Sequence, residues 1–151
     1  MSFDTPAGTR GARQPSGPLF RLVNKLMAGR IRRSGRFRGS NALILTTVGR
    51  KTGQERSTPV NWFPGPDGSR LIVASAAGAA GNPGWYYNIA ANPDKVRIEV
   101  EGRTVAVDAE QLHDAERERA WEQIVSASPG FADYEKKTDR ELPVIRLTER
   151  N

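Results

Sequence analysis

Cysteine and histidine are almost absent from this chain. Its 151 residues include no cysteine and a single histidine, His113. Without cysteine the chain has no disulfides, no thiolate metal ligands and no cysteine nucleophile, and one histidine cannot form a metal cluster. His113 stands in a polar run, residues 112–116, where we expect a solvated side chain near a helix start rather than the base of a Ser-His-Asp triad. The sequence therefore predicts no metal site and offers few groups for hydrolase chemistry.

Long hydrophobic runs are also missing. No stretch approaches the ~20 apolar residues that a membrane-spanning helix needs. The apolar segment from Leu19 to Met27 is interrupted by Arg21 and Lys25, so it does not match a secretory signal. These two absences predict a cytoplasmic protein.

The length of the chain limits its organisation. A chain of 16.6 kDa is long enough for one ordinary core but too short for a cofactor domain plus a separate substrate domain. Residues 1–17 are rich in Gly, Pro, Ser and Thr and show no apolar period, which predicts a disordered arm. We therefore expect one domain, residues 18–151, in which cofactor and substrate share one surface.

Positive charge is concentrated in the N-terminal third. The formal net charge is +6, and residues 1–54 contribute +10 whereas residues 55–151 contribute −4. Such asymmetry indicates an anionic partner, namely nucleic acid, a membrane face or a polyanionic cofactor. Nucleic acid is the least favoured of these, because the N-terminal arginines are not interleaved with aromatic residues that could stack on bases.

The N-terminal basic segment, residues 18–33, has the period of an amphipathic helix. Its apolar positions include Leu19, Leu22, Val23 and Leu26, and arginines and a lysine occupy the remaining face. Two interpretations are open. The helix either packs on its own domain or rests on anionic lipid as an interfacial helix, and the two do not exclude each other.

The remaining pattern predicts a sheet with few helices. Pro59 lies within one extended run and indicates an edge or irregular strand. Five or six antiparallel strands with two or three helices fit an α+β barrel better than a doubly wound sheet. The predicted strands are residues 42–48, 57–63, 71–75, 96–100, 104–108 and 142–147, and further helices are predicted at residues 82–92 and 115–127.

Two constellations can carry chemistry. In the first, a turn bracketed by Gly49 and Gly53 lets the backbone approach a ligand closely, and three cations and a threonine hydroxyl stand there to bind a phosphate. It is not a P-loop, because Arg50 separates the glycine from Lys51, and a solvated hairpin tip is the alternative. In the second, small residues 76–81 follow Ser75 and precede aromatic residues that either form a pocket for a flat ring or belong to the core.

Several ordered motifs give the chain a family resemblance. The runs 42–54 and 82–93, and residues 133–134 followed by 138–140, resemble the deazaflavin-dependent nitroreductase family of actinobacteria. The resemblance covers residues 19–147, and several motifs in one order are more specific than any one alone. It implies a flavin-reductase-like split β-barrel, coenzyme F420 as the cofactor, and hydride transfer to quinones or nitro compounds.

The resemblance also implies roles for individual residues. The phosphate-bearing, polyglutamate tail of F420 would be bound by Arg50, Lys51, Thr52, Gln54 and Arg56. The residues near the deazaflavin ring would be Pro59, Ala74, Ser75, Trp85 and Asn88. The acceptor pocket would comprise Asn61, Trp62, Ser128, Phe131 and Tyr134, with Ser75 or Tyr134 donating a hydrogen bond or proton to the acceptor.

Some positions depart from the family pattern. Ala76 stands where a lysine is expected, and Asn61, Ser128 and Phe131 stand where nitro-reducing members carry tyrosines. These departures predict a quinone reductase that reduces nitro compounds poorly. The alternatives are a split barrel that uses flavin mononucleotide or haem, and a cofactor- or lipid-binding protein without turnover. We expect a monomer, peripheral on the inner face of the cell membrane if the basic helix binds lipid.

Overall fold

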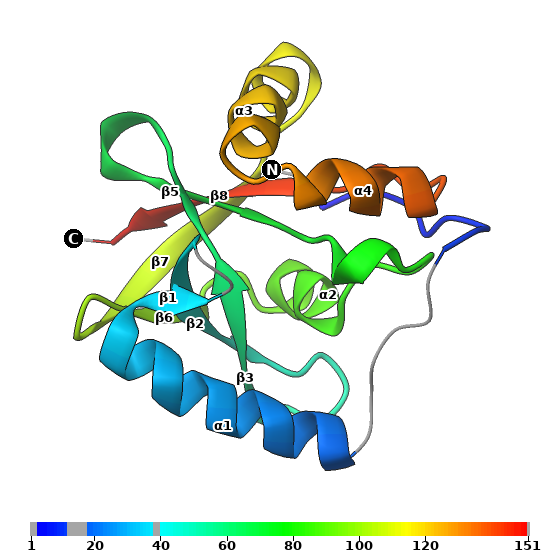
Figure 1. Cartoon of the computed structure of the whole chain (residues 1–151). Coiled ribbons are helices and arrows are strands. Elements are labelled where there is room, and N and C mark those ends of the chain that lie inside the picture. The colour runs from blue at the N-terminus through cyan, green and yellow to red at the C-terminus, as the bar shows by residue number, and fades with distance from the viewer. Residues whose placement is uncertain (1–2, 12–17, 38–39, 151) are drawn as a thin grey trace.

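The computed structural model describes residues 3–11, 18–37 and 40–150 of the chain (Figure 1). Its helices are α1 (Pro18–Ser34), α2 (Gly84–Ala91), α3 (Asp114–Ala127) and α4 (Gly130–Lys137), and its short 3-10 helices are η1 (Pro66–Gly68) and η2 (Ala76–Gly78). Its strands are β1 (Arg36–Phe37), β2 (Ser40–Val48), β3 (Glu55–Asn61), β4 (Phe63–Pro64), β5 (Arg70–Val73), β6 (Arg97–Val100), β7 (Arg103–Gln111) and β8 (Val144–Glu149).

The strands form one antiparallel sheet in the order β1-β2-β6-β7-β8-β5-β4, and β3 pairs with β2. The sheet curls so that β3 also contacts β5, with α1 on one side and α3 on the opposite side (Figure 1). This arrangement confirms the predicted α+β split barrel. It has more strands than predicted because β1 and β4 are two residues long, too short to show an alternating pattern.

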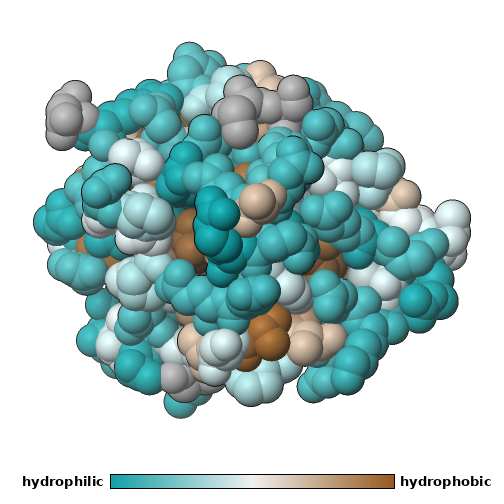
Figure 2. Space-filling view, turned by 90° about the horizontal axis from the view of Figure 1, so that it is seen from above, coloured by the Kyte–Doolittle hydropathy of each residue, from teal (hydrophilic) through white to brown (hydrophobic). Residues whose placement is uncertain are grey.

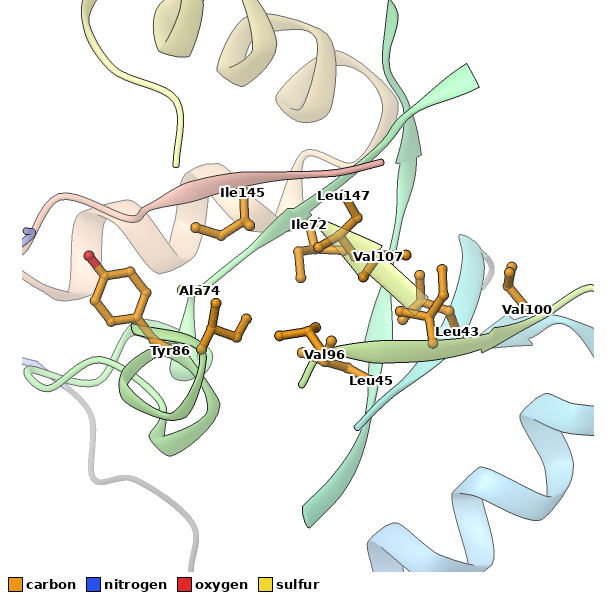
Figure 3. Close-up of a cluster of buried hydrophobic side chains, with 12 residues drawn as sticks. Leu43, Leu45, Ile72, Ala74, Tyr86, Val96, Val100, Val107, Ile145 and Leu147 are labelled. Atoms are coloured by element: carbon orange, nitrogen blue, oxygen red, sulfur yellow. The ribbon is translucent and has the colours of Figure 1, made fainter. Parts of the chain in front are cut away.

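Strand β2 is buried on both faces. Leu43 and Leu45 belong to the central core (Figure 3), whereas Ile44 points to the other face and packs against Ala28 and Ile31 of α1. Side chains alternate along a strand, so an uninterrupted apolar run is expected where both faces are covered. Helix α1 is thus docked by its C-terminal half, in agreement with the first of the two interpretations of this segment.

The N-terminal half of α1 is different. Leu19, Leu22 and Leu26 expose 74%, 53% and 65% of their surface. By contrast, the face on the side of α3, seen from above, is predominantly hydrophilic (Figure 2). No helix in the described ranges has both the length and the apolar character needed to cross a membrane.

Helix α4 was not predicted. Its eight residues follow Pro129 and begin with glycine, and only Phe131 and Tyr134 mark its apolar side. Two apolar positions are too few to establish a helical period. The other helices lie close to their predicted bounds, because each carries several apolar residues on one face.

The segment at residues 3–11, here called the strap, differs from the disordered arm that we predicted for residues 1–17. The Thr5 amide donates to the Tyr86 hydroxyl (3.0 Å), Asn82 Nδ2 donates to the Thr5 carbonyl (2.9 Å), and the Gly8 amide donates to the Ala80 carbonyl (2.7 Å). The strap is held chiefly by hydrogen bonds, which composition does not reveal. Residues 1–2 and 12–17 lie outside the described ranges.

A histidine ties the strap to the start of α3. His113 is the N-cap residue of α3, and its Nε2 lies 3.0 Å from Asp4 Oδ1. This hydrogen bond raises the pKa of His113 above its usual 6.5 and lowers the pKa of Asp4. Because the pKa of His113 is raised by folding, the contact stabilises the strap fully below about pH 6.5 and is lost as the pH rises through the folded-state pKa.

We therefore expect the strap to be held more tightly at about pH 5.5 than at about pH 8. Hydrogen exchange at the Thr5 and Gly8 amides, corrected for intrinsic rates, should show faster opening at the higher pH. His113→Gln should remove this difference while the exchange of β2 amides stays unchanged. A strap whose opening in the variant keeps the same pH dependence would show that another group is responsible.

Candidate functional site

A cavity of about 1010 Å³ lies between α1, β3, the start of α2 and α4. Its volume is at the upper end of the range for small-molecule sites. Among its lining residues are nine that the sequence analysis proposed: Arg56, Pro59, Asn61, Ser75, Trp85, Asn88, Ser128, Phe131 and Tyr134. Segments far apart in the sequence therefore meet at one site, as a cofactor and an acceptor that share one surface require.

Other predicted residues lie outside the cavity wall. Arg50, Lys51, Thr52 and Gln54 are exposed on the turn between β2 and β3, at the end of the strand pair whose β3 lines the cavity. Ala74 is fully buried in the central core, and its amide and carbonyl are hydrogen-bonded to Pro143 and Arg140.

Trp62 does not line this cavity. It lines a second cavity of about 660 Å³, where the Arg70 guanidinium lies 5.0 Å from the centre of its ring. Because neighbouring side chains along an extended chain point to opposite faces, Asn61 faces the first cavity and Trp62 faces away from it. The sequence predicted that neighbouring side chains in this extended run lie on opposite faces, but it did not show which of the two faces would line the cavity.

The turn between β2 and β3 is shaped by two glycines. The Gly49 amide donates to the Gln54 carbonyl (2.7 Å) and the Gly53 amide to the Gly49 carbonyl (2.9 Å). A Cβ at Gly49 would lie 2.8 Å from Thr52 Oγ1, which in turn accepts from the Gln54 amide (3.2 Å). Gly53 has a φ of +70°, in the left-handed region that favours glycine. The turn therefore has one defined shape with its polar groups near its tip.

Asn88 joins this turn to the cavity. Its Oδ1 accepts from the Arg50 amide (3.2 Å), and its Nδ2 donates to Thr47 Oγ1 (3.2 Å). Asn88 and Thr47 are both buried and both line the cavity. The Arg50 guanidinium also lies 4.7 Å from the centre of the Tyr87 ring. Helix α2 thus fixes the turn relative to the cavity, and the two form one continuous site.

The cations of the turn have no acidic partners nearby. Glu55, at the start of β3, is bound by Arg97, whose Nη2 lies 2.8 Å from Oε1, and this hydrogen bonding lowers the pKa of Glu55. Within the described ranges no carboxylate pairs with Arg50, Lys51 or Arg56, whereas seven arginines elsewhere are in ion pairs. Three cations therefore remain available to an external anion.

The opposite end of the cavity is aromatic. The rings of Phe63, Phe131 and Tyr134 stack edge to face, with centroids 5.8 Å and 5.7 Å apart along the series. Helix α4, which carries two of these rings, sits close to η2, because a Cβ at Gly78 would lie 3.0 Å from the Tyr134 carbonyl oxygen. Ser75 immediately precedes η2, and its hydroxyl makes no hydrogen bond to the described part of the chain. This end thus offers an aromatic wall and the hydroxyl groups of Ser75, Ser128 and Tyr134.

Sequence reasoning missed the contribution of α1 to the site. Val23, Asn24 and Met27 line the cavity. The sequence analysis assigned the apolar residues Val23 and Met27 to packing or to lipid binding. A helical period shows that a helix has an apolar face, but it does not show what that face contacts. Trp85 combines two roles that were treated as alternatives, since it lines the cavity and also packs against the central core.

The residues present fit a cofactor with a flat ring and an anionic tail. The cavity is wide enough for a ring system, and Pro59 and Trp85 give it half-buried, largely apolar walls. The unpaired cations lie next to it, where charge-assisted hydrogen bonds can hold phosphate or carboxylate groups.

Comparisons with known proteins identify the family. A family model described as F420H(2)-dependent quinone reductase matches residues 21–149. The chain is 39% identical over 138 residues to an F420H(2)-dependent quinone reductase of Mycobacterium tuberculosis, which covers 87% of this chain and 91% of the relative.

Solved structures agree with this match. An F420H2-dependent reductase, FDR-A, is 34% identical with a TM-score of 0.62 over 71% of this chain and 93% of that chain. A structure described as a domain-swapped dimer is 31% identical with a TM-score of 0.63 over 87% of this chain and 100% of that chain, and the monomer expected here stays a prediction. By sequence and fold, this chain belongs to the F420H(2)-dependent quinone reductase family.

Proposed function

We propose that the chain holds the ring of coenzyme F420 in the cavity and its anionic tail on the turn between β2 and β3, and reduces a quinone bound against the aromatic wall. Family membership identifies the cofactor and the acceptor class. The observation that carries the residue assignments is the continuous site: a large cavity with unpaired cations at one end and hydroxyl groups beside an aromatic wall at the other.

At the tail end, the protein's task is to bind. Arg50 and Lys51 lie on the exposed turn and Arg56 lines the cavity, so the three cations extend from the solvent-exposed surface to the cavity. Thr52 and Gln54 are exposed on the same turn and add polar side chains. Charge-assisted hydrogen bonds from these groups suit a phosphodiester followed by carboxylates.

At the ring end, the protein's task is to orient and to exclude water. When bound, the reduced deazaflavin ring supplies the hydride. Pro59 and Trp85 give this part of the cavity rigid walls, and Asn88 is already engaged by Thr47 and Arg50. Walls that are fixed by packing hold reacting atoms at the roughly 3 to 3.5 Å separation that transfer needs.

At the acceptor end, the protein must stabilise negative charge on a quinone oxygen. A quinone becomes a hydroquinone by gaining one hydride and one proton, and a hydroxyl group next to the oxygen can supply the hydrogen bond or the proton. Ser75 and Tyr134 are the hydroxyl-bearing candidates, and the Tyr134 ring is held edge to face against Phe131. Asn61 and Ser128 add polar groups but no phenol rings to the same wall.

A second proposal concerns the membrane. The exposed leucines of α1 lie on the same helix as Lys25, Arg30 and Arg33, all of which are exposed. We infer that the exposed side of α1 rests on an anionic lipid surface, from which a lipid-soluble quinone could reach the cavity past Val23 and Met27. A cofactor- or lipid-binding protein without turnover, the alternative to this enzyme, would show the same binding but no quinone reduction.

The tail assignment predicts that Lys51→Ala and Arg56→Ala each weaken F420 binding by roughly 10- to 150-fold, the effect of losing one charge-assisted hydrogen bond. A titration of F420 fluorescence measures the dissociation constant. Arg33→Ala, which removes an exposed cation outside the site, is the matched control and should bind normally. Unchanged affinity in both turn variants would sink the assignment.

The acceptor assignment predicts a quinone reductase that reduces a bicyclic nitroimidazole poorly, because a misplaced acceptor costs on the order of 100-fold in rate. Tyr134→Phe keeps the ring stack and removes only the hydroxyl, so it should lower kcat by about 10-fold or more with little change in F420 affinity. Values of kcat/KM for a menaquinone analogue and a nitroimidazole decide the question. A preference for the nitro compound, or an undiminished kcat in Tyr134→Phe, would mean that the acceptor pocket is assigned wrongly.

The membrane proposal predicts co-sedimentation with phosphatidylglycerol vesicles that weakens with salt, since each basic side chain near an anionic surface contributes about 1 kcal/mol. Because Ala28 and Ile31 dock α1 on β2, substitution is a better test than truncation. The double variant Leu22→Gln/Leu26→Gln changes exposed positions and should release the protein from vesicles without altering F420 affinity. Equal sedimentation of variant and parent would refute the lipid contact.

A further inference from the structure

A buried arginine holds the segment between β5 and α2, residues 74–82, which is here called the Ser75 loop. Arg140 is 3% exposed and donates to four oxygens of this one segment. Its Nη2 lies 2.8 Å from the Ser75 carbonyl and its Nε 3.2 Å from the Ala79 carbonyl. Its Nη1 reaches the Ala74 carbonyl (2.9 Å) and Asn82 Oδ1 (2.8 Å). One planar guanidinium therefore fixes both ends and the middle of the loop.

This use of an arginine is unusual within the molecule. In the described residues no carboxylate is paired with Arg140, while Arg70, another buried arginine, is bound to Glu101 and Glu149. Burial lowers the pKa of Arg140. Burying a cation without an opposite charge costs folding free energy, so the role of Arg140 must lie in its directed hydrogen bonds. Those bonds all end on the Ser75 loop.

The loop needs such support because its backbone is strained. Ala76 has a φ of +46°, in the left-handed region that residues other than glycine rarely adopt. Ser75 and Ala76 line the cavity, and so do Pro83 and Trp85, which follow Asn82 directly along the chain. A change in the loop therefore moves the Ser75 hydroxyl and the wall of the ring pocket together.

The strap closes the loop from the side away from the cavity. A Cβ at Gly8 would lie 2.3 Å from Asp139 Oδ1, and a Cβ at Gly11 would lie 2.5 Å from the Ala80 amide nitrogen. Asp139 accepts from the Thr9 hydroxyl and from the amides of Arg10 (3.0 Å) and Thr9 (2.8 Å), contacts that lower its pKa to about 2. The strap thus binds both the loop and the turn that carries Arg140.

We propose that Arg140 is a positioning residue for quinone reduction. It fixes the position of the Ser75 hydroxyl and of the cavity wall formed by residues 83–85, and the strap packs over the Ser75 loop that Arg140 holds. This inference rests on the proposed function of the cavity. Arg140 is absent from the cavity wall and lies apart from the basic turn, so it acts on the geometry of transfer rather than on the affinity for the anionic tail.

The test compares Arg140→Lys with Arg70→Lys. Lysine keeps the charge but replaces a planar fork with one nitrogen, which cannot reach four acceptors on different sides. Arg70 is also buried, but it donates to the carboxylates of Glu101 and Glu149 and lies against Trp62 at the other cavity. The readouts are melting temperature, hydrogen exchange of the amides in residues 75–84, the F420 dissociation constant, and kcat and KM for a quinone.

In Arg140→Lys we expect amide exchange in the Ser75 loop to rise by about 10-fold or more and kcat to fall by about 10- to 100-fold, with F420 affinity changed less than about threefold. Arg70→Lys should lower the melting temperature without raising amide exchange in the Ser75 loop or lowering kcat. If Arg140→Lys does not fold, Asp139→Ala removes the exposed strap contacts instead and should give the same changes on a smaller scale.

Two results would overturn the proposal. Loop exchange that stays at the parent rate in the folded variant would show that Arg140 does not hold the loop. Faster loop exchange with unchanged kcat would show that the role of Arg140 is structural only. If the parent protein reduced no quinone with F420H2, the proposed function would fail instead, and the exchange comparison would still report on the loop.

Discussion

The site depends on the side-chain amide of Asn88. By accepting from the Arg50 amide and donating to Thr47, it ties the basic turn to α2 and to a strand that is buried on both faces. A turn at the tip of a long hairpin would otherwise be free to move relative to the barrel. With the amide in place, the cations and the ring pocket keep one spacing, which a cofactor with a ring and a charged tail requires.

Pairing of charges distinguishes the binding groups from the rest of the surface. Arg97 neutralises Glu55, the acidic side chain closest along the chain to the turn, and six further arginines are bound to carboxylates. Exposed ion pairs of this kind add little stability. None of the ion pairs in the described ranges involves Arg50, Lys51 or Arg56, so these cations next to the cavity can bind an incoming anion. At the other end, Arg140 is also without a carboxylate, but it is turned inward to hold a loop.

Elements with a strong local pattern could be predicted from the sequence. The apolar run of β2, the hairpin to β3 and the period of α1 and α3 are each set by several residues, and Pro59 does lie on a strand that pairs with β2 alone among the described strands. The strap, the four bonds of Arg140 and the outward orientation of Trp62 depend on contacts between distant segments, which leave no local period. For the same reason the share of α1 in the cavity wall was missed.

We propose that this cavity and turn bind F420 in preference to a general flavin. The most direct test is an equilibrium titration of the parent protein with F420 and with flavin mononucleotide over a range of salt concentrations. We expect F420 to bind more tightly than flavin mononucleotide, with an affinity that falls as salt screens the unpaired cations. Equal or tighter binding of flavin mononucleotide, or an F420 affinity that does not respond to salt, would contradict it.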